Sequence, residues 1–182
     1  MIRKIPNILT IGRIIIIPII LFFMYIPTVF ASKIAGYLFL MACITDFLDG
    51  YLARVLSVQS KIGVFLDPIA DKLLVGSVIL VLVSKQRIDL IPAVAIILRE
   101  ILVSGLREFL AGLKVSVPVT SLAKVKTFFQ MAALFILIMG NEGFGLSFAT
   151  YIGRFALWFS AALTIFTGYI YMQASIKYLK EE

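Results

Sequence analysis

Residues 37–54 read YLFLMACITDFLDGYLAR and residues 63–84 read GVFLDPIADKLLVGSVILVLVS, so two apolar stretches each carry a pair of aspartates. Similar apolar stretches recur along the chain, and 62% of its 182 residues are hydrophobic. An average soluble domain holds about 45–50% apolar residues, so part of this surface must face lipid. At roughly 20 residues per crossing, the chain has room for about six spans. We therefore predict an all-α, polytopic membrane protein, a six-transmembrane-helix bundle that forms one domain over residues 1–182.

The breaks between apolar stretches place the helices near 9–30, 34–56, 62–84, 88–112, 121–140 and 153–177. Most lysines and arginines fall at one set of helix ends, which favours both termini and the connections around 57–61 and 112–121 in the cytoplasm. The other set of ends keeps Lys33, Lys85, Arg87 and Arg154. The first apolar run, 14–30, is long enough to remain as a helix, so we expect no cleaved leader and a location in the cell (inner) membrane.

The residue types present limit the chemistry. Histidine is absent and Cys43 is the only cysteine, which excludes an internal disulfide, cysteine-rich zinc sites and histidine general bases. The net charge of +7 is compatible with an anionic substrate or an anionic lipid surface. The basic residues form no exposed stripe outside the apolar segments, so nucleic acid is not an expected partner.

The four aspartates of the opening stretches need compensation by cations, because an ionised carboxylate at membrane depth costs roughly 2.5–3.5 kcal/mol. Asp46 and Asp49 are three residues apart and Asp67 and Asp71 four apart, so each pair lies on one helix face. Because a short connection joins the two helices, we expect them to be antiparallel neighbours, with Asp49 level with Asp67 and Asp46 level with Asp71.

Four carboxylates without histidine or cysteine make an oxygen-only site, which matches Mg²⁺ or Mn²⁺, and they can serve two ions. Paired metals of this kind support displacement at phosphorus, here at a nucleotide pyrophosphate. Two alternatives stay open at this point. The acids could form structural ion pairs with Arg54, Lys72 and Arg99, or the chain could be a divalent-cation transporter.

The motif over residues 46–71 reads D-x-x-D-G-x-x-A-R, eight residues, then G-x-x-x-D-x-x-x-D, and it resembles the signature of the CDP-alcohol phosphatidyltransferase family. The resemblance implies attack of an alcohol hydroxyl on a CDP-linked lipid such as CDP-diacylglycerol, with release of CMP, in a homodimer. It implies that Asp46, Asp49, Asp67 and Asp71 bind the metals, and that Asp71 is also the general base. It further implies a CDP-lipid site at Asn7, Thr10, Gly50, Ala53, Arg54 and Gly63.

Residues 98–108 (LREILVSGLRE), 123–127 (AKVKT) and 6–10 (PNILT) with Arg13 resemble the branch of that family that uses sn-glycerol 3-phosphate and makes phosphatidylglycerophosphate. The acceptor phosphate would then meet Arg99, Arg107 and Lys124, because Arg suits bidentate phosphate binding. Anchoring at lipid headgroups is the other interpretation of the basic residues, and it is favoured for Lys126. Asn7 could instead cap the first helix. Inositol phosphate, serine and phosphatidylglycerol remain alternative acceptors.

Overall fold

A computed structural model describes residues 5–55, 61–113 and 121–180, and within them the chain is all-helical. The prediction of six helices is confirmed. In chain order they are α1 (Ile5–Tyr25), α2 (Val29–Val55), α3 (Lys61–Ser84), α4 (Leu90–Gly112), α5 (Ser121–Phe144) and α6 (Ala149–Lys180).

The end of the first helix differs from the prediction. The apolar run through Phe30 suggested one helix over 9–30, whereas α1 ends at Tyr25 and α2 begins at Val29. Pro27 lies between them, and proline has no backbone N–H to continue a helical ladder. Thr28 caps the start of α2, because its Oγ1 accepts a hydrogen bond from the Ala31 backbone N–H at 3.2 Å. A tight turn therefore separates two helices that hydropathy alone merges.

The first helix lies between the two helices that carry the aspartates. α1 packs against both α2 and α3, whereas α2 and α3 make few direct contacts among the described residues. The expectation that α2 and α3 pack directly as neighbours is therefore wrong in this part of the chain. Connection length limits how far two helices can separate, but it does not decide which third helix fills the space between them.

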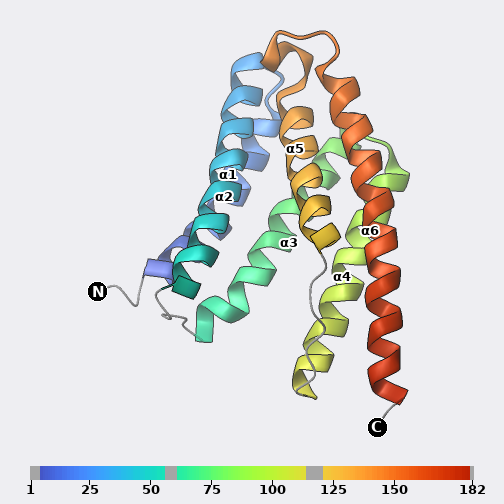
Figure 1. Cartoon of the computed structure of the whole chain (residues 1–182). Coiled ribbons are helices and arrows are strands. Elements are labelled where there is room, and N and C mark those ends of the chain that lie inside the picture. The colour runs from blue at the N-terminus through green and yellow to red at the C-terminus, as the bar shows by residue number, and fades with distance from the viewer. Residues whose placement is uncertain (1–4, 56–60, 114–120, 181–182) are drawn as a thin grey trace.

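The remaining helices complete the bundle. α5 packs against α2 and α6, and α6 also packs against α4 (Figure 1). The buried core contains apolar side chains from all of these layers, including Ile20, Phe39, Ile79, Ile96 and Leu137. The starts of α1 and α3 and the ends of α4 and α6 all lie in the lower half of Figure 1.

The outside of the bundle is also apolar. Large side chains such as Phe22, Phe30, Phe128 and Phe155 are exposed. In water such a surface would be a liability, whereas in a bilayer it faces lipid tails. Among the described residues, three stretches are long and apolar enough to cross a membrane, namely Val29–Asp46, Leu122–Phe144 and Ala149–Ile176. The chain is a membrane protein with several candidate spans.

Two cations in the connection between α3 and α4 satisfy backbone carbonyls at helix ends. Lys85 Nζ donates to the Met24 carbonyl in the last turn of α1. Arg87 Nη1 donates to the carbonyls of Leu137 and Ile138 at 3.1 and 2.9 Å, just before Gly140 interrupts α5 with a φ of 67°. Such carbonyls have no intrahelical partner, so a cation there stabilises the helix end.

Candidate active site

Arg13 of α1 joins the two aspartate-bearing helices. Its Nη1 lies 2.5 Å from Asp46 Oδ1 on α2 and 2.9 Å from Asp71 Oδ1 on α3. The Arg13 side chain is 2% exposed, whereas the two carboxylates are 39% and 41% exposed. One nitrogen reaches both acids, so Asp46 and Asp71 lie at the same level, as their distances from the α2–α3 connection predicted.

Asp67 belongs to the same cluster, because its carboxylate interacts electrostatically with those of Asp46 and Asp71. Asp49 lies within α2, but its side chain is outside the described part of the structure. Two of the four aspartates therefore contact one buried guanidinium, and a third lies within electrostatic range of them. The matching of Asp49 with Asp67 stays a prediction.

The donor set at this cluster fits a hard divalent cation. All of its ligand atoms are carboxylate oxygens, which Mg²⁺ and Mn²⁺ prefer. The Arg13 guanidinium lies between Asp46 and Asp71, so these two oxygens already converge on a positive charge. Taken without the Asp49 side chain, the described residues contain no group of three or more acidic, histidine or cysteine side chains close enough to hold a metal ion. A metal site at this cluster therefore stays a prediction, and it depends on the fourth carboxylate of the motif.

Arg13 is a partner of the aspartates that the sequence analysis did not name. The alternative of structural ion pairs names Arg54, Lys72 and Arg99 as partners of the aspartates, and Arg13 is not among them. Instead, Lys72 Nζ donates to Ser104 Oγ on α4. The sequence does indicate this pairing, because an arginine inside an apolar helix needs a carboxylate nearby.

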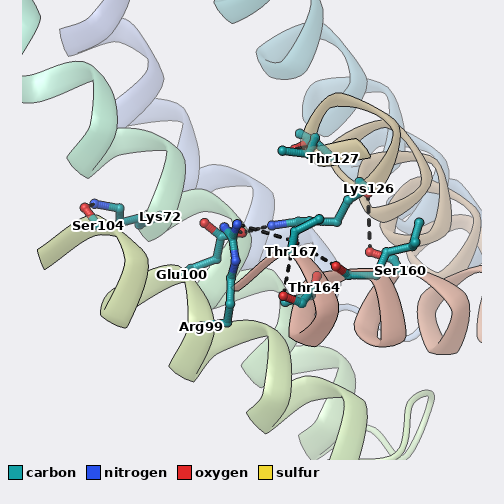
Figure 2. A network of polar contacts seen from close by, with 11 residues as sticks. Lys72, Arg99, Glu100, Ser104, Lys126, Thr127, Ser160, Thr164 and Thr167 are labelled. Carbon is teal, nitrogen blue, oxygen red and sulfur yellow. Dashed lines mark hydrogen bonds and ion pairs between the residues drawn. The ribbon is translucent and has the colours of Figure 1, made fainter. Parts of the chain in front are cut away.

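A second polar cluster joins α4, α5 and α6 (Figure 2). Lys126 Nζ pairs with Glu100 Oε1, and Arg99 Nη1 lies 3.6 Å from the same oxygen. Arg99 Nη2 donates to Thr167 Oγ1 at 3.4 Å. Lys126 is only 2% exposed, so the expectation that it anchors the chain at lipid headgroups is wrong. A snorkelling lysine keeps its ammonium group in water, whereas this one is buried against a carboxylate.

The other two basic residues expected at the acceptor phosphate are exposed. Lys124 is exposed near the start of α5. Arg107 is exposed on α4, and its guanidinium carbon lies 5.7 Å from the centre of the Tyr171 ring. Arg107 and Arg99 also interact electrostatically. Both exposed cations are accessible to an anionic ligand.

A cavity of about 300 Å³ lies between α3 and α4. Its walls are mostly apolar, and its polar lining comes from Lys72 of α3 and Glu100 of α4. The cavity therefore lies beside the α4–α5–α6 cluster, on the side that faces α3.

The residues predicted to bind the CDP-lipid lie in helices, but their side chains are outside the described part of the structure. They are Asn7 and Thr10 in α1, Gly50, Ala53 and Arg54 in α2, and Gly63 in α3. Because α1 already begins at Ile5, Asn7 lies inside the helix, so the alternative that it caps that helix is wrong.

An all-helical membrane bundle with a carboxylate cluster on two helices defines the class of protein. The chain belongs to the CDP-alcohol phosphatidyltransferase family, whose model matches residues 3–166. It is 53% identical to a CDP-diacylglycerol–glycerol-3-phosphate 3-phosphatidyltransferase of Rickettsia felis, over 97% of each chain. The protein of that name from Rickettsia typhi is 52% identical over 97% of this chain and 99% of its own. CDP-diacylglycerol–glycerol-3-phosphate 3-phosphatidyltransferase 2 of Arabidopsis thaliana is 36% identical over 92% of this chain and 78% of its own.

Proposed function

We propose that this chain transfers the phosphatidyl group of CDP-diacylglycerol to sn-glycerol 3-phosphate, giving phosphatidylglycerophosphate and CMP. The observation that carries the proposal is the 53% identity with the Rickettsia felis enzyme over 97% of both chains. The carboxylate cluster around Arg13 supplies the chemistry that such a transfer needs. Family membership decides against the divalent-cation transporter.

Asp46, Asp49, Asp67 and Asp71 would hold Mg²⁺ or Mn²⁺, and four carboxylates suffice for two ions. When bound, the ions neutralise the pyrophosphate and stabilise the leaving phosphate. Arg13, buried beside two of these acids, limits their mutual repulsion before substrate arrives. The helices therefore hold the acids together in advance of binding.

The transfer is a displacement at the β-phosphorus of CDP-diacylglycerol. The terminal hydroxyl oxygen of sn-glycerol 3-phosphate forms a bond to that phosphorus, and the bond from phosphorus to the CMP oxygen breaks. The hydroxyl proton passes to the Asp71 carboxylate, and CMP leaves with the bonding electron pair. A carboxylate can act as this general base when it lies within hydrogen-bond reach of the hydroxyl. Asp71, partly exposed at the cluster, is accessible for that role.

The two substrates are assigned to different helices. The CDP-lipid is expected against α1, α2 and the start of α3, at Asn7, Thr10, Gly50, Ala53, Arg54 and Gly63. The acceptor phosphate is expected at Arg99, Arg107 and Lys124, on α4 and α5. Two exposed cations and one partly buried cation give this second region the charge that a phosphate requires.

Because the acceptor is soluble, it also bears on which side of the membrane the active site faces. We place both termini and the active site on the cytoplasmic side of the cell membrane, where glycerol phosphate and CDP-lipid can meet, because most basic residues lie at that set of helix ends. A homodimer with one catalytic domain per chain is expected from the family. Inositol phosphate, serine and phosphatidylglycerol are the competing acceptors.

The test uses purified chain in detergent with CDP-diacylglycerol, and it measures CMP release and the lipid product. CMP should appear only when Mg²⁺ or Mn²⁺ and sn-glycerol 3-phosphate are both present. Asp67→Asn should abolish release. Asp89→Asn is the matched control, because Asp89 accepts a hydrogen bond from Trp158 at the other end of the bundle. Faster release with inositol phosphate, serine or phosphatidylglycerol would overturn the acceptor assignment.

A further inference from the structure

Glu100 connects two cations that come from different helices. Its Oε1 pairs with Lys126 Nζ of α5 and lies 3.6 Å from Nη1 of Arg99, its neighbour on α4. Its side chain is 29% exposed and lines the cavity between α3 and α4. One carboxylate therefore holds α5 against α4 and, at the same time, contacts the guanidinium of Arg99 (Figure 2).

The position of Arg99 is also fixed from α6. Its Nη2 donates to Thr167 Oγ1, and the bare backbone at Gly168 leaves room for its aliphatic part. A Cβ added at Gly168 would lie 2.9 Å from Arg99 Cγ, which is closer than real contacts allow. Glu100 and Thr167 thus contact the guanidinium while Gly168 accommodates the stem, so little freedom remains to this side chain.

The cluster is left with excess positive charge. Arg99 and Lys126 carry two positive charges against the single negative charge of Glu100, and Arg107 adds a third positive charge within electrostatic range of Arg99. Among the described residues, Arg99 Nε and Thr164 Oγ1 are buried and have no hydrogen-bond partner. Buried polar atoms and uncompensated charge are costly, and a bound anion would compensate the excess charge of this cluster.

We propose that Glu100 is a positioning residue for the acceptor phosphate. Lys126 holds the Glu100 carboxylate in place, and this carboxylate contacts the Arg99 guanidinium and keeps it oriented toward the phosphate. This inference rests on the proposed function, because it takes Arg99 as part of the acceptor site. Glu100 itself need not touch the substrate. It acts through Arg99, whose guanidinium must present its donors in a fixed direction to bind a phosphate with two parallel hydrogen bonds.

This role and simple electrostatics predict opposite results for one substitution. Removing a negative charge near a phosphate site should tighten phosphate binding if only the field matters. If Glu100 positions Arg99, its removal frees the guanidinium, and binding weakens. The KM for sn-glycerol 3-phosphate in Glu100→Gln therefore separates the two, since glutamine keeps the shape and loses only the charge.

The experiment compares wild type, Glu100→Gln and Glu108→Gln in detergent, and it measures KM separately for both substrates. Glu108 is the matched control because it lies two turns further along α4 and is exposed. We expect Glu100→Gln to raise the KM for sn-glycerol 3-phosphate about tenfold, the size of a lost charge-assisted hydrogen bond. The KM for CDP-diacylglycerol should change less than about twofold, and Glu108→Gln should match wild type.

An unchanged or lower KM for sn-glycerol 3-phosphate in Glu100→Gln would overturn the proposal. Equal rises in both KM values, or a loss of kcat alone, would show that Glu100 only holds helices together and would also overturn it. If Glu100→Gln does not fold, Glu100→Asp replaces it, and its KM for the acceptor should rise by about threefold, with no rise counting against the proposal. Wild-type protein that fails to use sn-glycerol 3-phosphate removes the proposed function and this inference together, whereas active wild type with an unaffected variant removes the inference alone.

Discussion

Replacing Arg13 with methionine should destabilise the metal-free protein and should make its stability depend on Mg²⁺. The substitution leaves the Asp46 and Asp71 carboxylates facing each other without the guanidinium that now lies 2.5 and 2.9 Å from them. Removing one partner of a buried ion pair costs about 3–5 kcal/mol. Here the carboxylates are 39% and 41% exposed, so water screens part of their repulsion, and we expect about 2–3 kcal/mol.

The assay is thermal unfolding in detergent, with chelator and with excess Mg²⁺. For a chain of this size, a loss of 2–3 kcal/mol corresponds to a fall in Tm of roughly 4–12 °C. Excess Mg²⁺ should restore at least half of that fall in Arg13→Met, because a bound cation replaces the missing positive charge. Lys85→Met is the matched control, since Lys85 satisfies a carbonyl of α1 far from the acids, and Mg²⁺ should not rescue it.

The reasoning about Arg13 would be refuted if Arg13→Met were as stable as wild type in chelator. It would also be refuted if Mg²⁺ raised the Tm of Arg13→Met and wild type by the same amount, because the ion would then bind elsewhere or independently of this charge.

Three further predictions follow from the same structure. Asp71→Asn should keep substantial Mn²⁺ binding but lose turnover, whereas Asp49→Ala should lose both, as measured by metal titration and CMP release; full turnover in Asp71→Asn removes its role as general base. Gly140→Ala should lower stability by about 1–2 kcal/mol in thermal unfolding, because its φ of 67° suits glycine, and an unchanged Tm would contradict this. Gly168→Val should weaken sn-glycerol 3-phosphate binding several-fold by displacing the Arg99 stem, and an unaltered KM for that substrate would argue against it.

The number and order of helices could be predicted because long apolar runs are separated by short polar breaks. The turn after Tyr25 could not, since apolar residues on both sides of Pro27 continue the hydropathy signal across it. Pro27 indicates the end of the helix better than hydropathy does. A run of apolar residues shows that a segment avoids water, but the local backbone chemistry decides whether one helix or two cross it.

It could be predicted that Asp46 and Asp71 lie at the same height along their helices, because they are equally far from the α2–α3 connection. Arg13 contacts both. The presence of α1 between α2 and α3 could not be predicted, because helical periodicity describes one element at a time and does not say which surfaces meet. The cation that pairs with these two acids therefore comes from α1, a helix that lies outside the motif.

The burial of Lys126 could have been predicted with closer attention to periodicity. Lys126, Gln130, Ala133 and Leu137 follow one another at helical spacing, and all four are buried, so they share the face of α5 that packs inside the bundle. Lys124 lies two residues earlier, nearly on the opposite face, and it is exposed. A charged residue in line with core positions indicates a buried ion pair more strongly than it indicates an anchor at the headgroups.

The most direct test of the central claim, that carboxylates on α2 and α3 gather divalent cations for phosphatidyl transfer, is an electron paramagnetic resonance titration of purified protein with Mn²⁺. Wild type should bind about two ions per chain, and Asp67→Asn should lose at least one of them while Asp89→Asn binds as wild type does. If Asp67→Asn bound as many Mn²⁺ ions as wild type, with the same affinity, the carboxylate cluster would not be the metal site and the account would be wrong.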